Sequence, residues 1–189
     1  MGREGLPPPS SPPDADLRGA LNDEAKRLIL DAAYSGRGHM EAAAFWQLWD
    51  SRLGLPATLL STLLAAGASV AALLKSQPEL TAGLAGLAAL LNAARAFLQP
   101  REKAQGHGLK GNKYITIRNE ARLIREIDLR SGLAAEELCA RIKALRGRYA
   151  ELKESDPLVI PRGAYEKAKR GIEAGESSYD NDPIWKELG

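Results

Sequence analysis

Two long apolar stretches lie close together in the middle of the chain. The first runs from Leu53 to Leu74 without an ionisable side chain, and the second runs from Leu80 to Leu98, interrupted in its last third by Asn92 and Arg95. A helix of about 22 residues is roughly 33 Å long, which matches a hydrocarbon core of about 30 Å. The pattern predicts two membrane-spanning helices, at about 53–74 and 80–98. Pro56 falls in the first turn of the first helix, where proline is tolerated.

The connection between the two stretches is only Lys75–Glu79, so the spans are expected to form an antiparallel hairpin. Lysine and arginine are concentrated outside the turn, which carries only Lys75. This asymmetry predicts that both termini are cytoplasmic. Trp46 and Trp49 precede the first span and suit either an interfacial anchor or packing against cytosolic helices. The basic residues counted at the cytoplasmic ends are Arg52, Arg101, Lys103, Lys110 and Lys113.

Helical spacing of apolar residues continues on both sides of the hairpin. It predicts cytosolic helices at about 16–33, 40–52, 102–130 and 134–154, and the last two are expected to pair antiparallel across Ser131–Gly132. The predicted fold is therefore all-α: a two-transmembrane-helix hairpin with flanking cytosolic helices. Residues 1–15 are proline-rich and expected to be disordered, 16–155 form the main domain, and 156–189 form an extension that is partly ordered at best. A buried hairpin in a soluble bundle is the alternative, but the first stretch is apolar on every face.

Small side chains recur every fourth position in both stretches. Such stripes let helices approach closely in lipid, so they are candidate contacts between the two spans or between neighbouring hairpins. Simple abundance of alanine is the competing explanation. The stripes consist of Ala57, Ser61, Ala65 and Ser69 in the first stretch and Ala85, Ala89 and Ala93 in the second.

Polar residues in the spans are the candidate functional groups, because polar side chains in a membrane are costly and often functional. Asn92, Arg95 and Gln99 follow at positions i, i+3 and i+7 and are predicted to share a face that lines the inner mouth of an oligomeric pore. Thr58 and Thr62 would add hydroxyl groups from the first span. Arg95 also lies close enough to the cytoplasmic boundary to snorkel, which requires no pore.

Composition narrows the remaining possibilities. With 26 basic and 24 acidic residues the net charge is +2, so no direct nucleic-acid binding is expected. A single cysteine and two histidines predict no disulfide framework, no metal site and no cofactor. Gly106, Gly108 and Gly111 match a G-x-G-x-x-G spacing but lack the preceding strand that a phosphate-binding loop needs, and they suit a hinge instead. No set of acid, base and nucleophile indicates an enzyme, and no catalytic residue is predicted.

The order of motifs along the chain resembles a known family. Trp49, the run Leu53-Gly54-Leu55-Pro56-Ala57-Thr58, a helical hairpin, Phe97-Leu98-Gln99-Pro100 with Arg101-Glu102-Lys103, and then His107, Tyr114 and Arg118 are similar to the SLATT family. These are two-transmembrane effectors that accompany nucleotide-synthesising and nucleotide-sensing domains in bacterial conflict systems. The resemblance covers roughly residues 17–152.

The resemblance implies a bacterial inner-membrane effector that is silent until an infection signal arrives and then forms a pore or perturbs the membrane. It also implies a nucleotide-synthesising or nucleotide-sensing partner protein, besides the lipid bilayer. Oligomerisation is expected because two helices cannot enclose a water path. His107, Tyr114 and Arg118 would share a cytosolic helix face that either receives the activating partner or packs on the N-terminal helix. A non-conducting membrane scaffold and a soluble helical adaptor are the alternatives.

Overall fold

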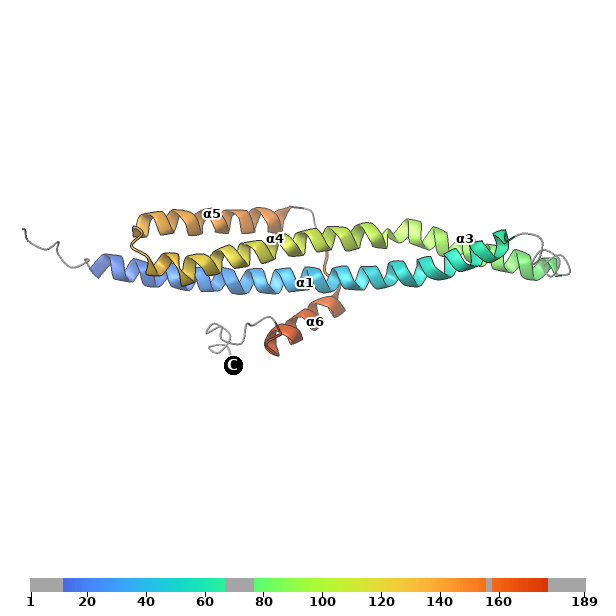
Figure 1. The fold of residues 1–189 in the computed structure, drawn as a ribbon, viewed down its shortest axis with the longest axis horizontal. Helices are drawn as coiled ribbons and strands as arrows, with labels where there is room; N and C mark the ends of the chain where they lie inside the picture. Colours follow the sequence, from blue (N-terminus) through green and yellow to red (C-terminus); the bar gives the residue numbers. More distant parts are fainter. Residues whose placement is uncertain (1–11, 67–76, 156–157, 177–189) are drawn as a thin grey trace, which may run out of the picture. The chain divides into compact units, whose positions relative to one another are not determined.

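In the computed structural model, residues 12–66, 77–155 and 158–176 are described, and every element in these ranges is a helix (Figure 1). The all-α prediction is therefore confirmed at this level. The span predicted at 53–74 is described only as far as residue 66, so its remainder and Ser69 lie outside the described residues. The elements are α1 (Pro12–Ala65), α3 (Pro78–Leu98), α4 (Pro100–Glu126), the short 3₁₀ helix η1 (Asp128–Arg130), α5 (Ala135–Glu154) and α6 (Arg162–Glu173).

Helix α1 is one continuous helix of 54 residues, so the prediction of separate helices at 16–33 and 40–52 is wrong. Gly36 lies where the break was expected, and its position has a packing reason. A Cβ atom there would lie 3.3 Å from the Cβ of Tyr114 and 3.4 Å from the carbonyl oxygen of Gly111. Gly36 thus lets α1 and α4 approach closely, and it does not end a helix. Pro56, expected in a first turn, lies inside α1.

The break after the second predicted span is at Gln99, because α3 ends at Leu98 and α4 begins at Pro100. Gln99 has φ 47° and ψ 49°, the left-handed conformation, and its N–H donates to the carbonyl of Arg95 at 3.0 Å. The ring of Pro100 disfavours a right-handed helical conformation for the residue before it. Helix α4 then runs unbroken past the three glycines, so the hinge predicted there is absent and the chain turns at Gln99 instead.

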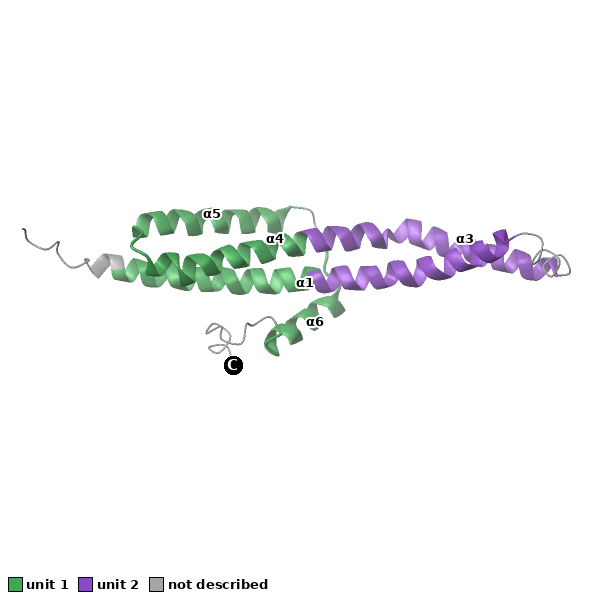
Figure 2. Ribbon diagram, viewed as in Figure 1, with its two compact units in different colours: residues 1–39, 110–189 green, residues 40–109 purple. Residues whose placement is uncertain are grey.

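The chain divides into two compact units (Figure 2). Unit 1 is formed by residues 1–39 and 110–189, and unit 2 by residues 40–109. Unit 1 therefore holds the first half of α1, most of α4, and all of η1, α5 and α6. Unit 2 holds the rest of α1, all of α3 and the start of α4, and so contains the described parts of both predicted spans.

The core of unit 1 lies where α1, α4 and α5 meet. Short connections through η1 turn the chain back, and α5 runs alongside α4 (Figure 1). Two arginines of α5 add ion pairs at the surface: Arg146 with Asp31 of α1 at 3.0 Å, and Arg148 with Glu120 of α4 at 2.6 Å. The predicted antiparallel pair is thus present. The buried core includes Leu28, Ile29, Ala32, Ile117, Ala121, Leu138, Ile142 and Leu145.

Helix α6 gives part of the C-terminal extension a defined place in unit 1. It buries one small-residue face, and Arg37 of α1 pairs with Glu176 just beyond its end at 2.5 Å. The end is a Schellman motif: Gly175 has φ 80°, and the N–H of Glu176 donates to the carbonyl of Gly171 at 2.9 Å. A Cβ at Gly171 would lie 2.6 Å from the Glu176 carboxylate, so a larger residue there would shift this flexible side chain. The buried face consists of Ala164, Ala168, Gly171 and Ile172.

Candidate membrane-facing site

Helix α3 is apolar, yet very little of it is buried. The stretch Pro78–Arg130 contains the only described segment that is long and apolar enough to cross a membrane, and 6% of its most apolar window is buried. A core helix of a soluble protein also passes a test of length and composition, but most of its surface is covered. The low burial of α3 therefore distinguishes it from a core helix.

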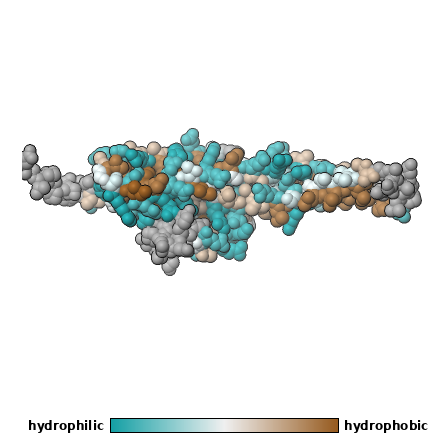
Figure 3. All heavy atoms as spheres, viewed as in Figure 1, coloured by the Kyte–Doolittle hydropathy of each residue, from teal (hydrophilic) through white to brown (hydrophobic). Residues whose placement is uncertain are grey.

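The described end of α1 and helix α3 both present exposed apolar side chains. Leu59 of α1 is 70% exposed, and Leu90 and Phe97 of α3 are 66% and 87% exposed. Figure 3 shows a brown, hydrophobic band along this part of the surface. Scattered apolar residues on a surface are ordinary, but a contiguous group of this size indicates contact with a membrane or another protein. The exposed members of the group in unit 2 are Leu55, Leu59, Leu63, Leu80, Leu87, Leu90 and Phe97.

The two predicted small-residue stripes differ in burial. Ala57 is buried at 2% exposure, whereas Ser61 and Ala65 are exposed. In α3 the buried small residue is Ala88, and Ala85, Ala89 and Ala93 are all exposed. A period of four drifts away from the 3.6-residue turn, so a stripe chosen by that period need not follow the contact line. The second stripe does not hold the two helices of one chain together.

Arg95 is held by a carboxylate that sequence reasoning missed. Its Nε donates to Oδ1 of Asp50 in α1 at 2.8 Å, and the two side chains are 38% and 24% exposed. The guanidinium also lies on Gly54, where a Cβ would be 3.3 Å from the Arg95 Cζ. Asp50 and Gly54 are four residues apart and so share a face of α1. This arrangement, which we call the Asp50–Arg95 clasp, ties α1 to α3 and balances the charge of Arg95.

The other predicted pore-lining residues do not converge in the single chain. Thr58 donates its hydroxyl to the carbonyl of Gly54 at 2.8 Å, and Asn92 donates its amide to the carbonyl of Ala88 at 3.0 Å. Both are bonds to the preceding turn of the same helix. Gln99 lies beyond the end of α3. The prediction that Asn92, Arg95 and Gln99 share one helix face is therefore wrong for Gln99. Thr62 is exposed.

An aromatic and basic group lies in unit 2 before the apolar part of α1. Phe45 makes edge contacts with Trp46 and Trp49, at ring centroid distances of 5.3 Å and 6.3 Å. The ammonium group of Lys103 lies over the Trp46 ring, 4.5 Å from its centroid, a cation–π geometry. Trp46 is half-buried by this packing, whereas Trp49 is 37% exposed. Packing thus accounts for Trp46, and Trp49 keeps a surface that suits an interface.

The residues predicted as a cytosolic activation face are largely covered. His107 in unit 2 is 1% exposed, and Tyr114 in unit 1 is 2% exposed. Arg118 is half-buried. Tyr114 stacks on His39 of α1 with ring centroids 5.6 Å apart, so this part of the face packs on the N-terminal helix. A partner would have to open this packing to reach Tyr114.

The buried ring of Tyr114 belongs to a small polar cluster inside unit 1. Its centroid lies 5.4 Å from that of Tyr149, whose hydroxyl is 3.1 Å from Oγ of Ser35. Burial, with a smaller contribution from Tyr149, raises the pKa of Tyr114 to about 12. No group of three or more metal-ligating side chains occurs among the described residues, and Cys139 is a half-buried free thiol.

Within the described residues, every element is a helix, and one helix is long and apolar enough to cross a membrane. The chain matches no model of a known protein family, no curated protein and no solved structure.

Proposed function

We propose that the chain is an integral membrane protein whose membrane hairpin includes α3 and the apolar part of α1. The observation that carries this proposal is the exposure of the apolar side chains of α3. Only 6% of the most apolar 18-residue segment is buried. Burying apolar surface contributes about 25 cal/mol for each Å², so leaving this band in water would be costly, whereas lipid covers it.

Within this proposal the protein acts as an effector that assembles into oligomers and perturbs the bacterial inner membrane. The exposed stripe of Ala85, Ala89 and Ala93 suits contacts between neighbouring hairpins, because small side chains allow close approach in lipid. The SLATT-like order of motifs supports the effector role, and it supports a nucleotide-linked partner as the activating input.

A non-conducting membrane scaffold is the second candidate, and the Asp50–Arg95 clasp favours it. Thr58, Asn92 and Arg95 are each bonded within one chain, so none of them needs a water-filled pore to satisfy its polar atoms. In this alternative the helices of unit 1 recruit a partner.

Membrane insertion is tested first, by washing membranes from expressing cells with alkaline carbonate. An inserted hairpin stays in the pellet, whereas a soluble adaptor is released, and release would refute both membrane proposals.

The effector is then separated from the scaffold with a potential-sensitive dye during induced expression. The effector dissipates the membrane potential when its activator is present, and the double variant Asp50→Asn/Arg95→Leu, which leaves no orphan charge, alters this effect. The double variant Asp50→Arg/Arg95→Asp, which keeps the pair, is the matched control. A potential that is preserved with and without the activator would favour the scaffold.

A further inference from the structure

Several surface recesses in unit 1 are lined by described residues, and three of them differ in charge. The groove between α4 and α5 is lined by Lys113, Arg148 and Glu151, and Arg148 is engaged by Glu120. The recess beside Asp128 also balances its arginines with carboxylates. The third recess lies between the start of α1, the end of α4 and η1, and we call it the arginine recess. Its charged lining residues are Arg18, Arg125, Arg130 and Glu126.

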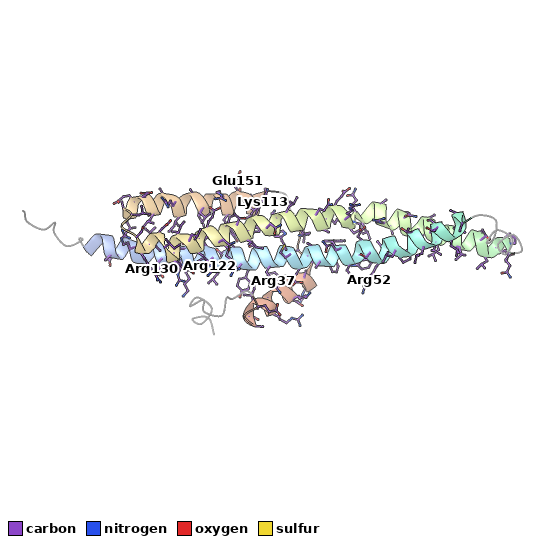
Figure 4. The ribbon with its side chains drawn as sticks, in the orientation of Figure 1. Arg37, Arg52, Lys113, Arg122, Arg130 and Glu151 are labelled. Carbon is purple, nitrogen blue, oxygen red and sulfur yellow. The ribbon has the colours of Figure 1, made fainter. Side chains whose placement is uncertain are left out.

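The arginine recess is a small, open hollow of about 320 Å³. This volume is at the lower end of the range for small-molecule sites, about 300–1,000 Å³. Gly19 forms part of the wall, and a Cβ there would meet no atom within 4 Å, so the space in front of it is open. Figure 4 marks Arg122 and Arg130 at this end of α4.

Two of the three arginines are held in place by neutral acceptors. Arg18 donates to the carbonyl of Leu129 at 3.1 Å and also to that of Leu133. Arg125 donates from Nε to Oδ1 of Asn22 at 3.2 Å. The Asn22 amide oxygen orients the Arg125 guanidinium without neutralising it. The positive charge of Arg125 is therefore available to a ligand.

The other charged residues of the arginine recess also leave the positive charge of Arg125 uncompensated. Glu126 is its only acid, and this carboxylate already accepts from Arg122 at 3.3 Å. Arg130 is exposed at the rim, on η1. In the part of the chain that the structure describes, neither Arg125 nor Arg130 has an ion-pair partner. Arg125 and Arg130 line the same recess, and their like charges repel each other. Binding of an anion there relieves this unfavourable interaction.

We propose that the arginine recess binds a phosphate group of a small ligand. Guanidinium groups present paired N–H donors that match two phosphate oxygens, and such charge-assisted bonds are stronger than neutral ones. Arg125 and Arg130 supply the donors, and Arg18 fixes the turn that carries Arg130. The phosphate belongs to a soluble phosphorylated compound or to a lipid headgroup, which offer the same chemistry. The site does not depend on the membrane proposal.

The test uses the full chain in detergent and isothermal titration with inorganic diphosphate at constant ionic strength. The wild type binds diphosphate, and Arg130→Gln binds it about tenfold more weakly or worse, as expected for loss of a bond to a charged group. Arg125→Gln serves as a second variant, and circular dichroism checks that both keep the helical content of the wild type. Arg162→Gln is the matched control, since this side chain is 92% exposed on α6 and lies outside the recess.

A parallel titration with phosphatidylglycerol in mixed micelles separates the two sources of phosphate. Diphosphate binding that Arg130→Gln weakens supports a soluble ligand. Binding of the lipid alone, weakened by the same variant, supports a headgroup. No binding of either probe, or equal weakening by Arg130→Gln and Arg162→Gln, would overturn the proposal.

Discussion

At the scale of single residues, Gly54 and Asp50 determine the position of the Arg95 guanidinium. The guanidinium packs on Gly54 because there is no side chain in its way, and this position allows the 2.8 Å bond to Asp50. An arginine near the end of a predicted span suits both snorkelling and pore lining. The structure adds a third arrangement, an ion pair between the two helices of the hairpin.

The substitution Gly54→Leu is expected to destabilise unit 2 because it pushes the Arg95 guanidinium away from Asp50. The flexible Arg95 side chain can move aside, so the expected cost is the loss of a partly exposed ion pair, about 0.2–1 kcal/mol. Thermal unfolding of the chain in detergent, followed by circular dichroism, measures the loss. Gly86→Leu is the control, because a Cβ at Gly86 meets nothing within 4 Å and leucine favours a helix more than glycine. Equal loss in both variants would show that the clasp does not depend on Gly54.

The buried phenol of Tyr114 is expected to lower the free energy of unfolding at alkaline pH. Its pKa rises from 10.0 to about 12 on folding, chiefly through burial. Because the folded pKa is the higher one, the neutral phenol stabilises the fold fully below pH 10, and this contribution is lost as the pH rises through about 12. The variant Tyr114→Phe should therefore lose less free energy of unfolding over this interval than the wild type does.

Urea unfolding at a series of alkaline pH values measures this difference. Tyr165→Phe is the control, since it removes the same hydroxyl group from a side chain that is 48% exposed. Identical pH profiles for the wild type and Tyr114→Phe would contradict the assignment.

At the scale of elements, helix length is set by contacts as much as by local sequence. The segment around Gly36 continues α1 because the glycine lies against α4, with Tyr114 and the Gly111 carbonyl nearby. Pro56 lies inside the same helix, although a proline removes one backbone hydrogen bond. By contrast, Gln99–Pro100 does end a helix, and the end falls where the apolar run stops.

The contact at Gly36 is expected to be intolerant of larger residues. Gly36→Leu must separate α1 from α4, because a backbone carbonyl cannot yield as a flexible side chain does, and a cost of about 1–3 kcal/mol is expected. The midpoint of urea unfolding, monitored by circular dichroism, reports this cost. Gly147→Leu in α5 is the matched control, because its Cβ would meet nothing within 4 Å. A lower midpoint for Gly147→Leu than for Gly36→Leu would refute close packing at Gly36.

At the scale of the whole molecule, the membrane proposal makes a prediction about topology. In a Cys139→Ser background, single cysteines replace Ser10, Gln77 or Ser178. An impermeant maleimide applied to intact spheroplasts should label the cysteine at position 77 and should label the other two only after permeabilisation, because both termini are expected inside the cell. Cys139 is the only native cysteine, so the background is free of competing thiols. Protection of all three positions in intact spheroplasts would rule out a hairpin that crosses the membrane.

Sequence predicted the features that depend on local pattern. The all-α class, the apolar stretch that became α3, its end at Leu98 and the pairing of α4 with α5 all follow from helical periodicity and from proline chemistry. The pattern alone left open whether Ala85, Ala89 and Ala93 contact the other span or a neighbouring hairpin. Their exposure shows that they do not pack against the other helix of the same chain. The continuity of α1 was missed because glycine in a helix is read as a break unless its neighbours in space are known.

What the sequence alone determined is the helical, partly lipid-compatible character of the chain, since hydrophobicity and periodicity are properties of neighbouring residues. Only the tertiary structure decided which polar groups meet. Asp50 and Arg95 are 45 positions apart, and Arg18 lies more than one hundred positions before Leu129. Contacts over such separations depend on how helices are placed in space, and no local pattern contains that information.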